Sequence, residues 1–218
     1  MNIQGLAGST RSINKAKRRD IILLEARKLI AIEGFEALKL RDLAARAGVT
    51  VPTIYNLIGG KPEILTLIIE DLVEQLQMVQ DSVSQLDTEW VFENQINQLA
   101  DLFAADEDYY RAAFIAGDRS GLFEQNSDTG IFARSVEAPI AACLAAQKSG
   151  RLIGRVSAEQ MGRQIYGCYR LARQDWTNGY FDLKTFRRQA LTGIFLCLAA
   201  DAEEAFRYSL LKRISLLV

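Results

Sequence analysis

The side chains best suited to chemistry lie in one stretch of this sequence, AGVTVPTIYNLIGGK, from Ala47 to Lys61. Its hydroxyl groups and its lysine can donate hydrogen bonds to phosphate oxygens, and its short apolar side chains can contact thymine methyl groups. The stretch contains no pair of a nucleophile and a general base. The chemistry it favours is therefore non-covalent binding to nucleic acid.

The rest of the chain contains no residue pattern typical of a catalytic or metal-binding site. The sequence has no histidine, and its three cysteines, Cys143, Cys168 and Cys197, are far apart and set among apolar neighbours. Catalysis with a histidine base and the common zinc sites each need a residue that is missing here. We expect no enzyme activity, no metal and no cofactor, and we interpret the cysteines as small buried hydrophobic residues in a reducing compartment.

Composition predicts an all-α protein. Of the 218 residues 49% are hydrophobic and 24% are charged, and only three prolines interrupt potential helices. The N-terminus has no apolar core of signal-peptide length, and the longest apolar run, residues 190–200, is short of the ~20 residues that cross a bilayer. We expect a cytoplasmic protein.

The charges are distributed unevenly along the chain. Residues 1–61 carry 11 Lys/Arg and 5 Asp/Glu, a net charge of +6, whereas residues 62–218 carry 15 and 22, a net charge of -7. Either the basic residues cluster by chance on solvated faces, or the first quarter of the chain is an electrostatic footprint for phosphates.

Three helices are predicted around the opening stretch. Apolar residues recur at three-and-four spacing over residues 18–33, which indicates an amphipathic helix that Gly34 ends. A second, shorter pattern begins at Leu40 and is closed by Gly48, and Thr50 then offers a hydroxyl group to cap a third helix. Two short helices joined by a tight turn are typical of a helix-turn-helix, whose second helix enters the DNA major groove.

We expect the residues at and near the start of the third helix to face DNA. Pro52 fits a first helical turn, the Tyr55 hydroxyl can contact a phosphate, and Lys61 begins the next helix, where exposed N–H groups favour anions. The predicted DNA-binding residues are Arg41, Thr50, Val51, Pro52, Thr53, Tyr55 and Lys61.

The segment from about residue 19 to 68 resembles the N-terminal domain of the TetR family of transcriptional regulators. The resemblance is carried by Gly34-Phe35, Leu43-Ala44, Ala47-Gly48-Val49, the Thr50 cap, Thr53-Ile54-Tyr55 and Lys61. It implies a homodimer that binds a pseudo-palindromic operator in double-stranded DNA, and a C-terminal domain that binds a small-molecule effector. The implied function is a transcriptional regulator, expected to be a repressor that the effector releases from its operator.

The expected organisation has three parts: a flexible basic arm over residues 1–17, a helix-turn-helix domain over 18–64 and an effector-binding and dimerisation domain over 65–218. The arm is either a solvated tail or a segment that reaches DNA. The sequence departs from the family pattern at two further positions. Lys39 stands where a Ser or Thr often caps the second helix, so we expect a weaker cap there. Val51 stands at a site that is often polar or basic, and we expect Val51 and Pro52 to touch thymine methyl groups.

Helices without repeats are predicted beyond Lys61, over 61–85, 88–105, 108–116, 130–148, 158–178 and 182–212, with loops at 117–130 and 150–154. The last two helices carry apolar stripes that either fill the core of the monomer or pair with a second chain. The resemblance implies pairing, and the predicted interface residues are Tyr169, Trp176, Leu191, Ile194, Phe195 and Leu198.

An effector pocket is implied by the resemblance, and the candidates are aromatic side chains with one arginine. They are Trp90, Phe103, Tyr110, Phe114, Phe132, Tyr166, Tyr169 and Arg170, each of which could also be ordinary core. They suggest a hydrophobic or aromatic effector, with Arg170 facing any anionic group. The alternative function is a helical adaptor that binds proteins rather than DNA.

Overall fold

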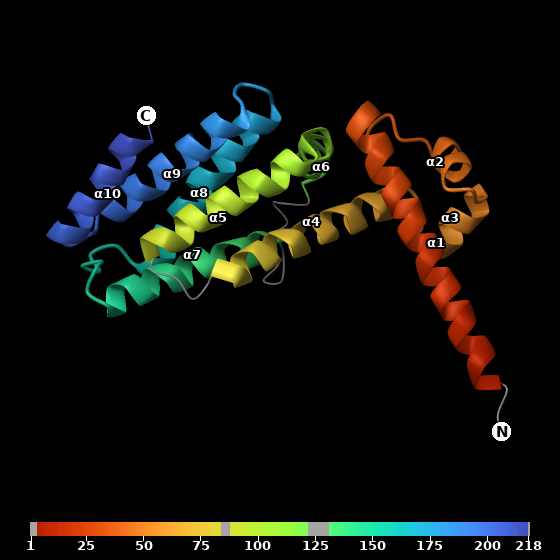
Figure 1. The fold of residues 1–218 in the computed structure, drawn as a ribbon, viewed down its shortest axis with the longest axis horizontal. Coiled ribbons are helices and arrows are strands. Elements are labelled where there is room, and N and C mark those ends of the chain that lie inside the picture. The colour runs from red at the N-terminus through yellow and green to blue at the C-terminus, as the bar shows by residue number, and fades with distance from the viewer. Residues whose placement is uncertain (1–3, 84–87, 122–130, 218) are drawn as a thin grey trace. The chain divides into compact units, whose positions relative to one another are not determined.

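The computed structural model describes residues 4–83, 88–121 and 131–217, and within these ranges the chain folds into ten α-helices (Figure 1). Side chains are described for residues 13–78, 91–121 and 135–217. An isolated antiparallel bridge joins Leu152 and Ala202. The predicted all-α class is confirmed. No helix in these ranges is long and apolar enough to cross a membrane.

The chain forms two compact units. The N-terminal unit comprises residues up to Leu72 together with Asp108–Ser120, and the C-terminal unit comprises Val73–Glu107 and the residues from Gly121 onward. The helices of the N-terminal unit are α1 (Gln4–Glu33), α2 (Leu40–Arg46), α3 (Val51–Leu57), the first part of α4 (Lys61–Val83) and α6 (Glu107–Arg119). α6 is therefore a sequence-distant addition to the helix-turn-helix segment, and the expected boundary at residue 64 falls inside α4.

The first helix is longer than the sequence pattern indicates. α1 begins at Gln4, so its first turns occupy most of the segment 1–17 that we expected to be a flexible arm. Periodicity marks only the part of a helix that packs, and the apolar side chains buried at Ile22, Ala26 and Ile30 lie in the second half of α1. Helix formers without a proline, such as Lys15 to Lys17, then let the helix extend beyond its packed part.

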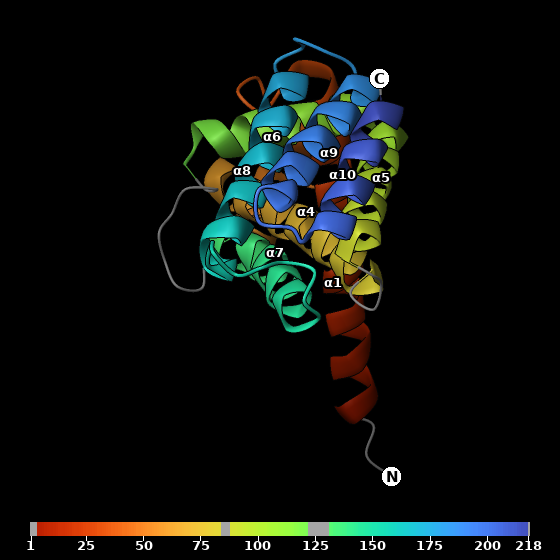
Figure 2. The ribbon, with the colours of Figure 1, turned by 90° about the vertical axis from the view of Figure 1, so that its left-hand side faces the viewer.

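The C-terminal unit contains the rest of α4 and five further helices, α5 (Thr88–Ala105), α7 (Ile131–Lys148), α8 (Ala158–Thr177), α9 (Leu183–Ala199) and α10 (Glu204–Leu216). α9 runs between α8 and α10 (Figures 1 and 2) and also packs against α5, while α7 packs against α8. The centre of the unit is aromatic. Phe103 and Trp176 stack with ring centroids 5.0 Å apart, Phe186 packs against both, and Trp176 donates a hydrogen bond to Glu107 Oε1 at 3.1 Å.

One predicted helix is two helices in the structure. The pattern over 182–212 predicts a single helix, but α9 ends at Ala199 and α10 begins at Glu204. The buried Asp201 carboxylate between them accepts hydrogen bonds from the backbone N–H groups of Gly154 and Arg155, at 2.9 and 3.0 Å. Glu203 caps α10 by accepting from Phe206 N at 2.6 Å. A tertiary contact and a new cap thus interrupt a pattern that is continuous in the sequence.

The cysteines correct a second prediction. Cys143 is buried, as we expected for a small hydrophobic residue, but Cys168 on α8 and Cys197 on α9 are partly exposed, with their Sγ atoms 3.8 Å apart. Spacing in the sequence could not reveal this contact, because it depends on how α8 and α9 pack against each other.

Candidate nucleic-acid interface and ligand pocket

A tight turn connects α2 to α3. Gly48 has a φ of +64°, a left-handed conformation that L side chains rarely adopt. The N–H groups of Gly48 and Val49 donate to the carbonyl groups of Ala45 and Ala44, at 3.3 and 3.0 Å. These bonds satisfy the last carbonyls of α2 in the manner of a Schellman motif and turn the chain towards α3. The sequence-based prediction of a glycine turn is confirmed.

α3 is fixed at its start by Thr50 and in the core by Ile54. The Thr50 hydroxyl accepts a hydrogen bond from Thr53 N at 3.3 Å, and Pro52 lies in the first turn. Ile54 is fully buried, so α3 cannot rotate without exposing it. By contrast Lys39, the N-cap residue of α2, makes no side-chain capping bond, as we expected.

The opposite face of α3 is open to solvent. Pro52 and Tyr55 are exposed, Tyr55 by 58%, while Val51 and Thr53 are partly exposed and the Thr53 hydroxyl bonds that of Thr50 at 2.8 Å. Arg41, on α2, is exposed as well. The predicted DNA-facing side chains of α2 and α3 are therefore accessible.

The sequence analysis missed Asn56. This residue is exposed on α3 beside Tyr55, and its amide can both donate to and accept from an adenine edge. A signal was present in the sequence, because Asn56 lies two positions after the core residue Ile54 and so falls away from the buried side of the helix.

Lys61 is engaged within the unit. Its Nζ donates to the backbone carbonyl of Glu36 at 2.7 Å and lies 4.8 Å from the centroid of the Phe35 ring. The Gly60 N–H, at the start of α4, donates to the Glu63 carboxylate at 2.7 Å. The chain's own groups thus occupy one donor of the lysine and the first amide that the sequence analysis assigned to a phosphate. Because an ammonium group has three N–H donors, Lys61 can contact a phosphate while it keeps its bond to Glu36.

α6 is held against α1 and α4 within the N-terminal unit. Arg27 of α1 forms an ion pair with Asp71 of α4, and its guanidinium lies 5.5 Å from the centroid of the Tyr109 ring on α6. Tyr110 and Phe114, also on α6, are buried. These two side chains, which we predicted as effector contacts, therefore lie buried on a helix that belongs to the N-terminal unit.

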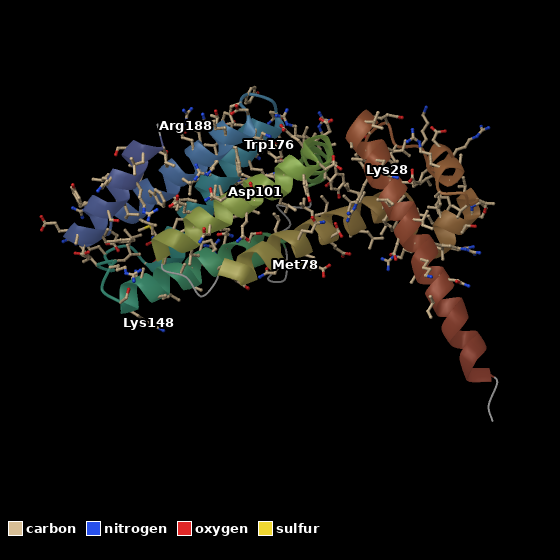
Figure 3. The ribbon with its side chains drawn as sticks, in the orientation of Figure 1. Lys28, Met78, Asp101, Lys148, Trp176 and Arg188 are labelled. Atoms are coloured by element: carbon tan, nitrogen blue, oxygen red, sulfur yellow. The ribbon has the colours of Figure 1, made fainter. Side chains whose placement is uncertain are left out.

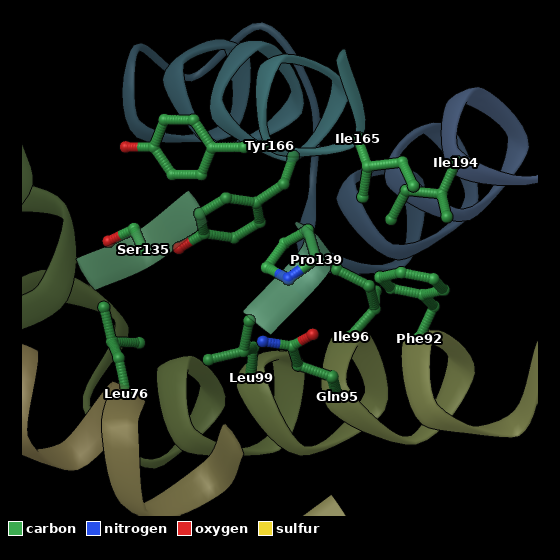
Figure 4. Close-up of a pocket in the computed structure, with 11 residues that line it drawn as sticks. Leu76, Phe92, Gln95, Ile96, Leu99, Ser135, Pro139, Ile165, Tyr166 and Ile194 are labelled. Carbon is green, nitrogen blue, oxygen red and sulfur yellow. The ribbon is translucent and has the colours of Figure 1, made fainter. Parts of the chain in front are cut away.

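A partly open cavity of about 60 Å³ lies within the C-terminal unit (Figure 4). Its apolar walls come from five helices, and its polar groups are one amide and three hydroxyls. The apolar residues are Leu76, Phe92, Ile96, Leu99, Pro139, Ile165 and Ile194, and the polar residues are Gln95, Ser135, Tyr166 and Tyr169. Figure 4 shows Ser135 and Tyr166 on one side and Phe92 and Ile194 on the other. No charged side chain lines this cavity among the described residues.

Only part of the predicted effector set reaches the cavity. Tyr166 and Tyr169 line it, with ring centroids 6.1 Å apart, whereas Phe103 belongs to the aromatic centre and Arg170 is not in the wall. The side chains of Trp90 and Phe132 lie outside the described residues. The remaining lining residues were missed because aliphatic residues from distant helices carry no pocket signal in a sequence.

The predicted dimer residues are core residues of the single chain. Five of them, Trp176, Leu191, Ile194, Phe195 and Leu198, are at most 1% exposed, and Tyr169 lines the cavity. The stripes are buried because α8 packs against α7 and α9 against α5. The other faces of the two helices carry exposed apolar side chains, Leu171 by 61% and Leu196 by 52%. Any interface on α8 and α9 must therefore use these outward faces.

Known proteins resemble this chain both in the sequence of its N-terminal segment and in its fold. Residues 22–66 match the family model described as bacterial regulatory proteins, tetR family. Over 86% of its length this chain is similar in fold to 92% of SmeT, the repressor of the Stenotrophomonas maltophilia multidrug efflux pump SmeDEF, with a TM-score of 0.69 and 20% identity.

Two further structures share this fold. A gamma-butyrolactone receptor described as ArpA-like has a TM-score of 0.65 and 13% identity, over 93% of this chain and 97% of the receptor. NalD, the secondary repressor of the MexAB-OprM efflux pump in Pseudomonas aeruginosa, has a TM-score of 0.63 and 19% identity, over 84% and 96% of the two chains. The curated protein sequences contain no match.

Proposed function

Since residues 22–66 match the family model described as bacterial regulatory proteins, tetR family, we propose that the chain is a repressor of this family, released from its operator by a small molecule. The observation that carries this proposal is the exposed face of α3. Pro52, Tyr55 and Asn56 are presented to solvent by a helix fixed at Thr50 and Ile54. A short helix fixed in this way suits the major groove.

Each exposed group has a defined role in the proposed complex. Val51 and Pro52 touch thymine methyl groups, Thr53 and Asn56 hydrogen-bond base edges, and Tyr55 binds a phosphate. Arg41 adds a phosphate contact from α2. Lys61 already donates to the backbone carbonyl of Glu36, so it contacts a phosphate through its remaining N–H donors.

The active species is a homodimer that pairs through the outward faces of α8 and α9. Leu171 and Leu196 are large apolar side chains that a single chain leaves open. A two-fold dimer places two copies of α3 on one face of the duplex, about 34 to 36 Å or a multiple of this apart, and so reads a pseudo-palindrome. Because bacterial DNA lies in the cytoplasm, we expect the dimer to act there.

The effector occupies the cavity lined by Ser135 and Tyr166. The cavity of about 60 Å³ is smaller than the ~300 Å³ or more of typical ligand sites, so an effector must widen it. Triclosan is bound by SmeT in its complex structure, and a similarly apolar compound with one hydroxyl group suits walls that carry hydroxyls but no charge. Arg170 does not lie in the wall, so an anionic effector in this cavity would be a buried charge without a partner. Such an effector is disfavoured, because burying an unpaired charge is costly.

Release follows from differential affinity. The dimer samples a form that fits the operator and one that does not, and an effector that binds the second form better shifts the population towards it. Leu76 connects the cavity to the DNA-binding segment along one continuous helix, because α4 begins at Lys61 and Leu76 lines the cavity. A displacement of Leu76 that widens the cavity is therefore transmitted along α4 to the DNA-binding segment.

The salt dependence of binding to duplex DNA separates this function from a protein-binding adaptor. A regulator binds sheared genomic duplex at low salt, and its affinity falls steeply as salt increases. Arg41→Gln should reduce the slope of log affinity against log salt by about 1, while Arg155→Gln in the loop before α8 should leave it unchanged. An adaptor would show no duplex binding at any salt concentration.

A further inference from the structure

Two cysteines from different helices meet in the C-terminal unit. The side chain of Cys168 on α8 lies over Gly193 of α9, so close that a Cβ atom built on Gly193 would be 2.9 Å from Cys168 Sγ. Cys197 follows Gly193 by one helical turn, and its Sγ lies 3.8 Å from that of Cys168. The glycine thus allows one thiol to sit between the helices and face the other.

The two thiols are chemically unequal. A hydrogen bond from the Cys197 thiol lowers the pKa of Cys168 to about 7, because the bond stabilises the thiolate. The same contact raises the pKa of Cys197, which keeps its proton. A thiol whose pKa is near the ambient pH combines a large thiolate fraction with good nucleophilicity.

The third cysteine differs in both respects. Cys143 is fully buried, and burial raises its pKa to about 12. It therefore remains protonated and out of reach of water-soluble oxidants, whereas Cys168 and Cys197 are both partly exposed in the single chain. Of the three cysteines, only Cys168 and Cys197 are partly exposed and close to each other, and the thiol of Cys168 has a lowered pKa.

We propose that Cys168 and Cys197 form a peroxide-oxidisable dithiol that closes a reversible disulfide between α8 and α9 of the same chain. The Cys168 thiolate attacks one oxygen of hydrogen peroxide, the O–O bond breaks, and hydroxide leaves while the sulfur becomes a sulfenic acid. The Cys197 sulfur then attacks the Cys168 sulfur, the S–O bond breaks, and the departing hydroxide takes the Cys197 proton.

The reaction is balanced without any further reactant. Two thiols and one peroxide yield one disulfide and two waters, so that the two sulfurs together lose the two electrons that reduce the peroxide. A dithiol reductant reverses the step by thiol–disulfide exchange. The proposal concerns the C-terminal unit alone and holds whether or not the chain binds DNA.

Mass spectrometry of the full-length, reduced protein tests the proposal. After treatment with a few equivalents of hydrogen peroxide, remaining thiols are alkylated in denaturant. The chain should become about 2 Da lighter before alkylation, take up one alkyl group in place of three, and yield a linked peptide pair containing Cys168 and Cys197. Dithiothreitol should restore all three thiols.

Three variants assign the roles of the cysteines. Cys197→Ser should stop at a sulfenic acid on Cys168 that dimedone captures, Cys168→Ser should form no disulfide, and Cys143→Ala should behave as the wild type. The wild-type peptide map does not depend on how well the variants fold. A chain that stays reduced, a disulfide that links two chains, or one that includes Cys143 would overturn the proposal.

Discussion

At the scale of single residues, DNA recognition depends on which side chains α3 leaves open. The sequence alone identified the capping role of Thr50, the core position of Ile54 and the exposure of Tyr55, because capping and helical periodicity are local properties. It could not show that Lys61 bonds to Glu36, since that contact joins residues 25 positions apart. Local roles were predictable, whereas partners chosen by the tertiary fold were not.

Tyr55→Phe should weaken binding to a specific duplex about tenfold, because one hydrogen bond from the phenol to a phosphate oxygen is lost. The unfolding temperature should stay unchanged, since the hydroxyl lies on a side chain that is 58% exposed. Fluorescence anisotropy measures the affinity. Tyr180→Phe, at a tyrosine exposed by 77% in the C-terminal unit, is the matched control. Equal losses in the two variants would remove Tyr55 from the interface.

At the scale of elements, close helix contacts determine the architecture of the C-terminal unit. The sequence predicted α5, α7 and α8 to within a residue or two, because each has a continuous apolar stripe and clear ends. It predicted one helix where α9 and α10 are separate, since the Asp201 contacts to Gly154 and Arg155 leave no local signal. For the same reason the cavity, assembled from five helices, was predicted only at Tyr166 and Tyr169.

Two glycines of α8 provide a matched test of this packing. A Cβ at Gly162 would lie 2.7 Å from the backbone nitrogen of Ile140 on α7, whereas a Cβ at Gly167 would meet nothing within 4 Å. Gly162→Ala should therefore lower the free energy of unfolding by about 2 kcal/mol through overpacking. Gly167→Ala should raise it by up to about 1 kcal/mol through helix propensity.

Urea denaturation at a fixed protein concentration measures both free energies, and holding the concentration constant excludes effects of association. Equal changes in the two variants would mean that α7 and α8 do not approach closely at Gly162.

The buried carboxylate of Asp201, between α9 and α10, leads to a separate prediction. Asp201→Ala should lower the free energy of unfolding by about 2 kcal/mol, because the two hydrogen bonds from the backbone N–H groups of Gly154 and Arg155 are lost. Asp101→Ala, at an exposed position on α5 (Figure 3), should change it by less than about 0.5 kcal/mol. Thermal unfolding followed by circular dichroism compares the two, and a tolerated Asp201→Ala would show that the α9–α10 break does not depend on this carboxylate.

At the scale of the whole molecule, the uneven charge distribution suits a protein that presents a basic segment to DNA and keeps an acidic remainder away from it. Two copies are needed for a two-fold site, and the proposed pairing surface is the outward side of α8 and α9. The sequence indicated these helices but selected their buried stripes, because an apolar stripe does not reveal whether it faces its own chain or another.

Leu171→Glu combined with Leu196→Glu should convert the dimer into a monomer, since the substitutions bring like charges into an apolar contact. Sedimentation measures the mass directly. Operator affinity should fall by at least about 100-fold, because each α3 then binds alone. Leu144→Glu, at a leucine exposed by 46% on α7, is the control and should leave both properties intact. A dimer that survives the double substitution would place the interface elsewhere.

The most direct test of the central claim is selection of genomic DNA fragments by the purified protein, followed by sequencing. The account predicts that a few fragments are strongly enriched and that they share an inverted repeat, with thymines beneath Val51 and Pro52 and half-sites separated by one helical turn or a multiple of it. It also predicts that Tyr55→Ala reduces the enrichment. A wild-type protein that enriches no fragment beyond random duplex, either with or without apolar effectors, would contradict the assignment as a DNA-binding regulator.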